Sequence, residues 1–252
     1  RSLWLELSLD MDISGHGAVP PINYTLKEKV AALDRVIKRN QKRIVRLTEP
    51  SLNMFREVGE LEGGLRGFML KNIRIFRPFI VPQLKKDEII YSLVSNTITL
   101  TGFSTQPGPP NNIPQLSNAV LDCRLLPEML TDKFLEKVRK WLNNDDIKIN
   151  IIHEGVIAKP TSPDIFFEFM KQAIISEYPG AGVISILAPA SNDNNFFRAK
   201  GIPAYGIIPV FLSLEHLSSI HNINERIPID LLEQGVRVHE ELLRLIVNNE
   251  QE

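Results

Sequence analysis

Alternating apolar and polar side chains predict β-strands in the first part of the chain. Residues 3–13 alternate with a period of two, and a loop at 14–21 with two glycines and two prolines ends the run. Residues 96–103 and 116–126 alternate in the same way, and 147–153 is a fourth apolar segment of strand length. Four strands are therefore expected before residue 154.

Two segments of this part carry apolar residues at helical spacing. The first, 25–42, begins with Thr25, which we expect to cap the helix with Glu28 as its partner three residues later. The second spans 131–143. The order strand, helix, insertion, two strands, helix, strand favours a four-stranded sheet with two helices on one face.

The segment between the first helix and the second strand, about 43–95, is interrupted by many prolines and glycines and predicts a mostly helical insertion. Its large apolar residues either form a small core of their own or form an exposed patch that contacts a partner. They are Phe55, Phe68, Met69, Leu70, Phe76, Phe79 and Ile80.

The last third of the chain has the order of an α/β domain, as in half of a larger open sheet. A linker at 160–163 precedes it. The expected elements are helices at 164–177 and 229–248, a helix that starts at Asn192-Asp193, and strands at 183–187 and 203–208.

Composition mainly excludes certain classes of partner and certain kinds of site. The formal net charge of −1 shows no basic excess, so we expect neither nucleic acid nor an anionic membrane as partner. One cysteine, Cys123, allows no intrachain disulfide and no cysteine-based zinc site. There is no signal peptide and no apolar run of membrane-spanning length, which leaves the compartment open between cytoplasm and periplasm. Because the chain starts in mid-strand without Met, we expect the natural N-terminus to lie upstream.

Two loops hold side chains suited to polarising a carbonyl. His16 lies between two glycines and before two prolines, so little crowds its imidazole, although a simple strand-ending turn explains the same residues. Asn111 lies in a long loop, where its amide can donate to an oxyanion. Asn and Pro also favour turns, and from residue types alone that structural explanation is preferred for Asn111.

Two further residues suit binding of charged groups. Arg124 follows Asp122 by two residues on a strand, so both side chains share a face. The guanidinium can clamp a carboxylate, but a structural Asp–Arg pair fits the spacing better. His221 precedes a helix with Glu225 four residues later, an arrangement that suits a metal ligand but is weak alone.

Taken together, these segments resemble the aminoacylase/carboxypeptidase family of two-zinc metallopeptidases across essentially the whole chain. Four stretches occur in the family's order. They are Gly15 to Pro20; Asn111 to Pro114 with Leu121 to Pro127; Asp193 to Gly206; and His221 to Pro228.

The resemblance implies an architecture. Residues 1–7 would end a catalytic part that lies upstream, 8–157 would be the lid or dimerisation domain, and 158–252 would be the C-terminal part of the catalytic domain. It also implies a homodimer through the lid domain, and hydrolysis of a peptide or N-acyl amide bond next to a free carboxylate in a small peptide or N-acyl amino acid.

The resemblance also implies catalytic and substrate-binding roles. His16 matches the lid histidine that stabilises the tetrahedral intermediate, often in the partner's site, and Asn111 matches the lid asparagine that holds the oxyanion. Arg124 matches the residue that binds the substrate carboxylate. Lys159 lies where a second basic residue can occur, and Asp193 matches an acidic position near the substrate.

The cofactors implied are two divalent metal ions, zinc first among them, with His221 as the last ligand. The sequence departs from the family at 188–192, where glycines are usual, and at Asn222, where glycine is common. The remaining metal ligands and the general base of the family lie upstream of the lid. We therefore expect the intact parent to be active and this chain alone to be inactive. A non-catalytic dimerisation or binding module is the alternative.

Overall fold

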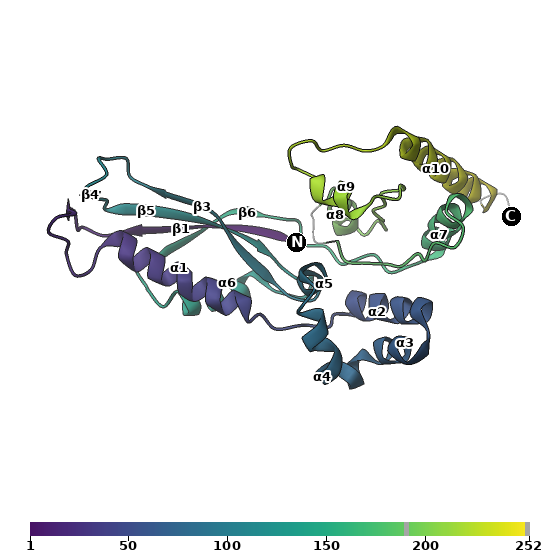
Figure 1. The fold of residues 1–252 in the computed structure, drawn as a ribbon, viewed down its shortest axis with the longest axis horizontal. Coiled ribbons are helices and arrows are strands. Elements are labelled where there is room, and N and C mark those ends of the chain that lie inside the picture. Colours follow the sequence, from purple (N-terminus) through teal and green to yellow (C-terminus); the bar gives the residue numbers. More distant parts are fainter. Residues whose placement is uncertain (189–191, 250–252) are drawn as a thin grey trace.

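A computed structural model describes residues 1–188 and 192–249 (Figure 1). The first part of the chain forms one antiparallel sheet in the order β3-β5-β1-β6. Its strands are β1 (Ser2–Asp10), β3 (Thr97–Thr105), β5 (Leu116–Arg124) and β6 (Lys148–Glu154). The mixed α/β class, with a four-stranded sheet and two helices, is confirmed.

The period-two pattern of β1 decides which face of the sheet is buried. Leu3, Leu5, Leu7 and Leu9 are all fully buried, beneath α1 (Thr25–Gln41) and α6 (Thr131–Leu142). β5 continues this face, because Leu121 opposes Leu5 in the antiparallel register. A shift of one residue would turn the whole leucine row towards water, so burial fixes the register.

The start of α1 differs from the expected capping box. Tyr24 is the N-cap residue, and no side chain caps the helix. Thr25 lies inside the helix, where its hydroxyl is buried and donates to the carbonyl oxygen of Gln115 at 2.8 Å. The Thr25 hydroxyl, which the local spacing predicted would cap the helix, therefore makes a tertiary hydrogen bond instead.

The insertion is helical, as expected, with α2 (Glu49–Glu62), α3 (Gly64–Lys71), α4 (Ile73–Leu84) and α5 (Glu88–Leu93). It has its own core, which includes Phe55, Leu70 and Ile80, with Met69 and Phe76 partly buried against it. The core interpretation is correct for these five of the seven residues, and contact of the remaining two with a partner stays a prediction. Phe68 and Phe79, on the outer sides of α3 and α4, are 52% and 66% exposed.

The C-terminal part contains α7 (Ile165–Glu177), α8 (Asn194–Ala199), α9 (Leu214–Ser219) and α10 (Ile229–Asn249), with α7 and α10 packed together. The strands expected at 183–187 and 203–208 are not formed. An extended segment becomes a strand only when a neighbouring strand pairs with it, and among the described residues neither segment has one. Ser185 donates instead from its main chain to Glu57 of α2, at 2.6 Å.

None of the helices in the described ranges combines the length and the apolar character that crossing a membrane requires.

Candidate functional site

A two-residue ladder at one end of the sheet joins the two loops that hold His16 and Asn111. Strand β2 (Gly15–His16) pairs antiparallel with β4 (Asn112–Ile113), so that His16 opposes Asn112. The main-chain N–H of Gly17 donates to the carbonyl oxygen of Asn111 at 2.8 Å. Two loops 95 residues apart in sequence are thus held side by side.

This ladder brings the two side chains into direct contact. The Asn111 side-chain amide lies 2.7 Å from Nε2 of His16, and both residues are exposed. The main-chain N–H of Ala18 donates to Nδ1 of His16 at 3.1 Å. A neutral imidazole carries one proton, so that proton belongs on Nε2 and faces Asn111. The amide atom that faces the ring is Nδ2, so in this tautomer two N–H donors lie next to each other, and a small turn of either side chain lets both donate to one ligand oxygen.

Arg124 lies at the far end of β5 and forms the expected pair with Asp122. Nη2 of Arg124 donates to Oδ2 of Asp122 at 2.7 Å, and both side chains remain partly exposed. The other oxygen of Asp122, Oδ1, is buried and has no hydrogen-bond partner in the described part of the chain. The structural pair is therefore real, and it leaves the remaining guanidinium N–H groups available to another carboxylate.

A small pocket of about 70 Å³ opens beside Arg124. Its wall combines the end of the four-stranded sheet, through Arg124 and Leu126, with the segment after α7, through Leu187 and Ala188. Arg124 therefore borders the C-terminal part of its own chain.

The His16–Asn111 pair and Arg124 lie at opposite ends of the sheet. Strand β5 runs nine residues from Leu116, which follows the β4 loop, to Arg124. At about 3.4 Å per residue the strand is roughly 27 Å long. Figure 1 shows β4 at one extremity of the molecule and the helices α8 and α9 towards the other. Within one chain, a small substrate that contacts Arg124 cannot reach the His16–Asn111 pair.

His221 follows α9 in a left-handed backbone conformation, with φ of 63°. Its main-chain N–H donates to Oε2 of Glu225 at 3.1 Å, and its side chain is exposed. Across residues 1–188 and 192–249, no group of three or more His, Cys, Asp or Glu side chains is arranged to hold a metal ion. The described donor set therefore does not by itself fit a metal centre.

The remaining candidate residues do not converge with these. Lys159 is exposed on the segment between β6 and α7, and Asp193 is exposed just before α8, where its carbonyl oxygen accepts from the N–H of Phe196. The departure from the family at 188–192 falls largely on 189–191, outside the described residues.

Sequence reasoning missed the β2–β4 ladder and the contact of Ala18 with the ring of His16. Strands of two residues have no periodicity to detect. The only local signal is the pair of loops themselves, Gly-His-Gly and Asn-Asn-Ile-Pro, whose contact depends on the sheet register.

The chain is similar to curated proteins of about twice its length. It is 24% identical over 232 residues to the N-fatty-acyl-amino acid synthase/hydrolase PM20D1 of Bos taurus, covering 89% of this chain and 45% of that protein. It is 26% identical over 181 residues to the probable carboxypeptidase S-like 2 of Dictyostelium discoideum, covering 70% of this chain and 34% of the relative. The chain thus spans less than half the length of these relatives.

Solved structures support the fold. An M20 family metallo-carboxypeptidase, Sso-CP2 from Sulfolobus solfataricus, superposes with a TM-score of 0.63 at 18% identity, covering 97% of this chain and 58% of that one. The dipeptidase Dug1p from Saccharomyces cerevisiae superposes with a TM-score of 0.59 at 15% identity, covering 96% and 53%. The sequence model of peptidase family M20/M25/M40 matches residues 13–245. The chain belongs to this family of peptidases.

Proposed function

We propose that the whole protein to which this chain belongs hydrolyses a peptide or N-acyl amide bond next to a free carboxylate, with the help of divalent metal ions. Membership of the peptidase family and similarity to a fatty-acyl-amino acid hydrolase and a carboxypeptidase support this general activity. The observation that carries the proposal is the contact between Asn111 and His16, at 2.7 Å, because it gathers two exposed N–H donors where one anion can accept from both.

In this proposal His16 and Asn111 stabilise the oxyanion that forms when the amide carbonyl is attacked. Nε2–H of His16 and the turned amide of Asn111 donate to that oxygen. The proton on Nε2 is kept in place because Nδ1 is already engaged by Ala18.

Arg124 binds the substrate carboxylate through the N–H groups that Asp122 leaves free. Lys159 is a second basic contact and Asp193 an acidic one near the substrate. The length of β5, roughly 27 Å at the usual rise per residue, supports a division between two chains. The His16–Asn111 pair then acts in the site of a second copy, and the dimer forms through the lid domain.

The metal ions are two, with zinc as the first candidate, and His221 is one of their ligands. The described residues lack a cluster of metal-binding side chains, so the remaining ligands and the general base come from parts of the protein outside this chain. The general base and the metal ions held by those parts would supply the activated water. This chain alone is therefore inactive.

The domain assignment belongs to the same proposal. Residues 8–157 form the lid domain, 158–252 form part of the catalytic domain, and 1–7 lead from the remainder of that domain into the sheet, where Ser2 already begins the inner strand β1. Large apolar side chains exposed in 158–249 support this, because a soluble domain normally buries such a surface. Those exposed by more than half include Ile208, Phe211, Leu214, Ile223 and Ile229.

The proposal is tested with the full reading frame and with this chain, each incubated with zinc. Both receive an N-acyl amino acid and the same compound with its carboxylate amidated. We expect hydrolysis of the free acid by the full protein only, and Arg124→Gln should raise KM for that acid without altering the metal content. Equal rates on both compounds would contradict the carboxylate contact, and hydrolysis by this chain alone would contradict its inactivity.

A second candidate is a non-catalytic module that dimerises through the insertion. It is favoured by the exposure of Leu65, Phe68, Ile75 and Phe79, between 52% and 76%, on α3 and α4. Sedimentation of this chain with and without Phe68→Ser and Phe79→Ser separates the two candidates. Loss of a dimer in the double variant favours the module, and a dimer that survives it favours the lid sheet as interface.

A further inference from the structure

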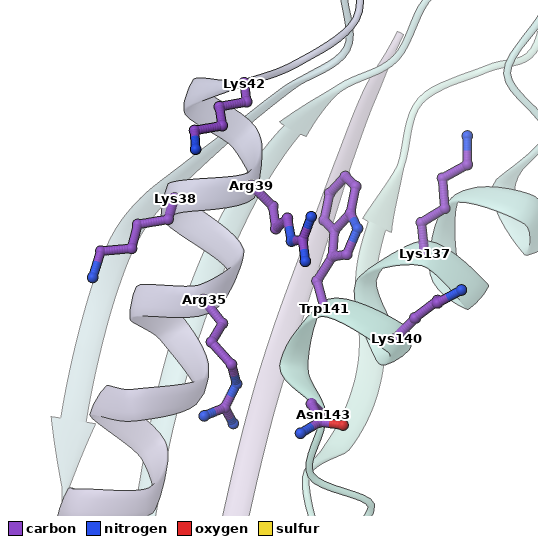
Figure 2. Close-up of a pocket in the computed structure, with 8 residues that line it drawn as sticks. All are labelled: Arg35, Lys38, Arg39, Lys42, Lys137, Lys140, Trp141 and Asn143. Atoms are coloured by element: carbon purple, nitrogen blue, oxygen red, sulfur yellow. The ribbon is translucent and has the colours of Figure 1, made fainter.

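A cleft with a volume of about 980 Å³ lies between α1 and α6, away from the candidate site. Figure 2 shows that the two helices line it from opposite sides, with the Trp141 ring standing between them. The lining residues are Arg35, Lys38, Arg39, Lys42, Lys137, Lys140, Trp141 and Asn143. Six of the eight are cations and none is an acid.

Most of this charge is not used within the protein. The side chains of Arg39, Lys42, Lys137 and Lys140 make no hydrogen bond or ion pair with any described residue. Elsewhere in the cleft, Lys38 pairs with exposed Asp34 at 2.8 Å. The guanidinium of Arg35 donates from Nε to the carbonyl oxygen of Leu142 at 3.0 Å.

Cations outside the lining also act on the cleft. Burial first, and then the charges of Arg46 and Lys133, lower the pKa of Lys137. Glu136 lies four residues before Lys140, at a spacing that suits an ion pair, yet no such pair is formed in the described structure. The net charge of −1 conceals a local excess of positive charge in the lining of this cleft.

An aromatic ring gives the cleft a second kind of contact. Trp141 is half-buried, packs on one side against the lid core, and stands beside the guanidinium of Arg39 in the gap between the helices (Figure 2). An indole face accepts a flat ring by stacking, and the flexible lysine stems around it can turn their ammonium groups towards a common anion.

We propose that this cleft binds a nucleoside polyphosphate, with the base against Trp141 and the phosphates between the arginines and lysines of α1 and α6. A polyphosphate places several negative charges close together, which matches the cluster of four unpaired cations. A ligand with a single carboxylate needs only one or two cations to bind it. The hollow shape suits a compact ligand better than a membrane surface, and the like charge of two facing clefts opposes a second copy of the chain.

Isothermal titration calorimetry of this chain tests the proposal with ATP, adenosine and tripolyphosphate as separate probes. We expect one ATP per chain, with weaker binding of tripolyphosphate and weaker still of adenosine. Lys137→Gln with Lys140→Gln should weaken ATP binding by about a hundredfold, since each of the two lost charge-assisted contacts is worth about one decade. Trp141→Phe should narrow the difference between ATP and tripolyphosphate, because it reduces stacking.

The matched control is Lys86→Gln with Lys200→Gln, which removes the same charge from exposed lysines outside the cleft and should leave ATP binding unchanged. Circular dichroism of each variant verifies folding. The proposal is overturned if no ATP binds at millimolar concentration, or if the control weakens binding as much as the cleft variant. It is also overturned if phosphatidylserine vesicles or a single-stranded oligonucleotide bind and ATP does not displace them.

Discussion

Lys29 provides the sharpest stability prediction, because it is fully buried beneath the sheet. Its ammonium group donates to the main-chain oxygen of Leu7 at 2.6 Å, yet burial lowers the pKa of Lys29 from 10.5 to about 8, against a weaker opposing effect of Glu6. The charged form is therefore less stable in the folded chain than in the unfolded chain. Replacing Lys29 with Met keeps the volume of the stem and removes the charge.

The magnitude follows from linkage between protonation and folding. A pKa lower in the folded state means that the unfolded chain binds more protons between pH 8 and 10.5, so the free energy of unfolding rises with pH across that window. At about 1.4 kcal/mol for each pKa unit, the charge costs roughly 3 kcal/mol at pH 7 and about 1 kcal/mol at pH 10. Lys29→Met should therefore be more stable than the natural chain by about 3 kcal/mol at pH 7, a gain that largely disappears at pH 10.

Urea unfolding of both proteins at pH 7 and pH 10 measures this difference. Comparing the two proteins at each pH removes the contribution of Cys123, whose pKa burial raises to about 12 in both. A stability difference that is the same at both pH values would refute the reasoning. So would a variant less stable than the natural chain at pH 7, which would mean that the hydrogen bond to Leu7 outweighs burial of the charge.

Four further substitutions test packing and helix capping. Phe134→Ala empties a core position that is 1% exposed, and should lower the free energy of unfolding by about 3–5 kcal/mol in urea. Gly67→Ala places a Cβ 2.3 Å from the carbonyl oxygen of Gly59, so the thermal midpoint should fall, whereas Gly102→Ala meets only ordinary contacts and should change little. Asp164→Ala removes the cap that accepts from two N–H groups of α7, and should cost about 1 kcal/mol, measured by thermal unfolding.

The four-stranded sheet could be predicted from sequence because a period of two governs its central strands. The buried leucine row of β1 alternates without interruption, and β5 repeats the alternation, so element type and face follow together for these two strands. The contact between Arg124 and Asp122 was predictable for the same reason, since residues two apart on a strand share a face.

The parts that sequence could not predict depend on contacts between distant segments. Thr25 has the spacing of a cap, but a carbonyl 90 residues away takes its hydroxyl. The segments 183–187 and 203–208 have strand-like composition, but pairing decides whether a strand forms. The separation of the His16–Asn111 pair from Arg124 follows only from the strand directions and register, which no local pattern contains.

The division of the active site between two chains is the central claim, and mixing two inactive variants of the full protein tests it most directly. His16→Ala and Arg124→Ala are each expected to hydrolyse an N-acyl amino acid slowly. If the oxyanion donors act in the partner's site, each mixed dimer contains one site with both residues intact. Random exchange of subunits makes about half of the dimers mixed, and half of the sites in each mixed dimer are complete. The mixture should therefore recover about a quarter of the natural rate of hydrolysis. A mixture no more active than the two variants measured separately would contradict the claim.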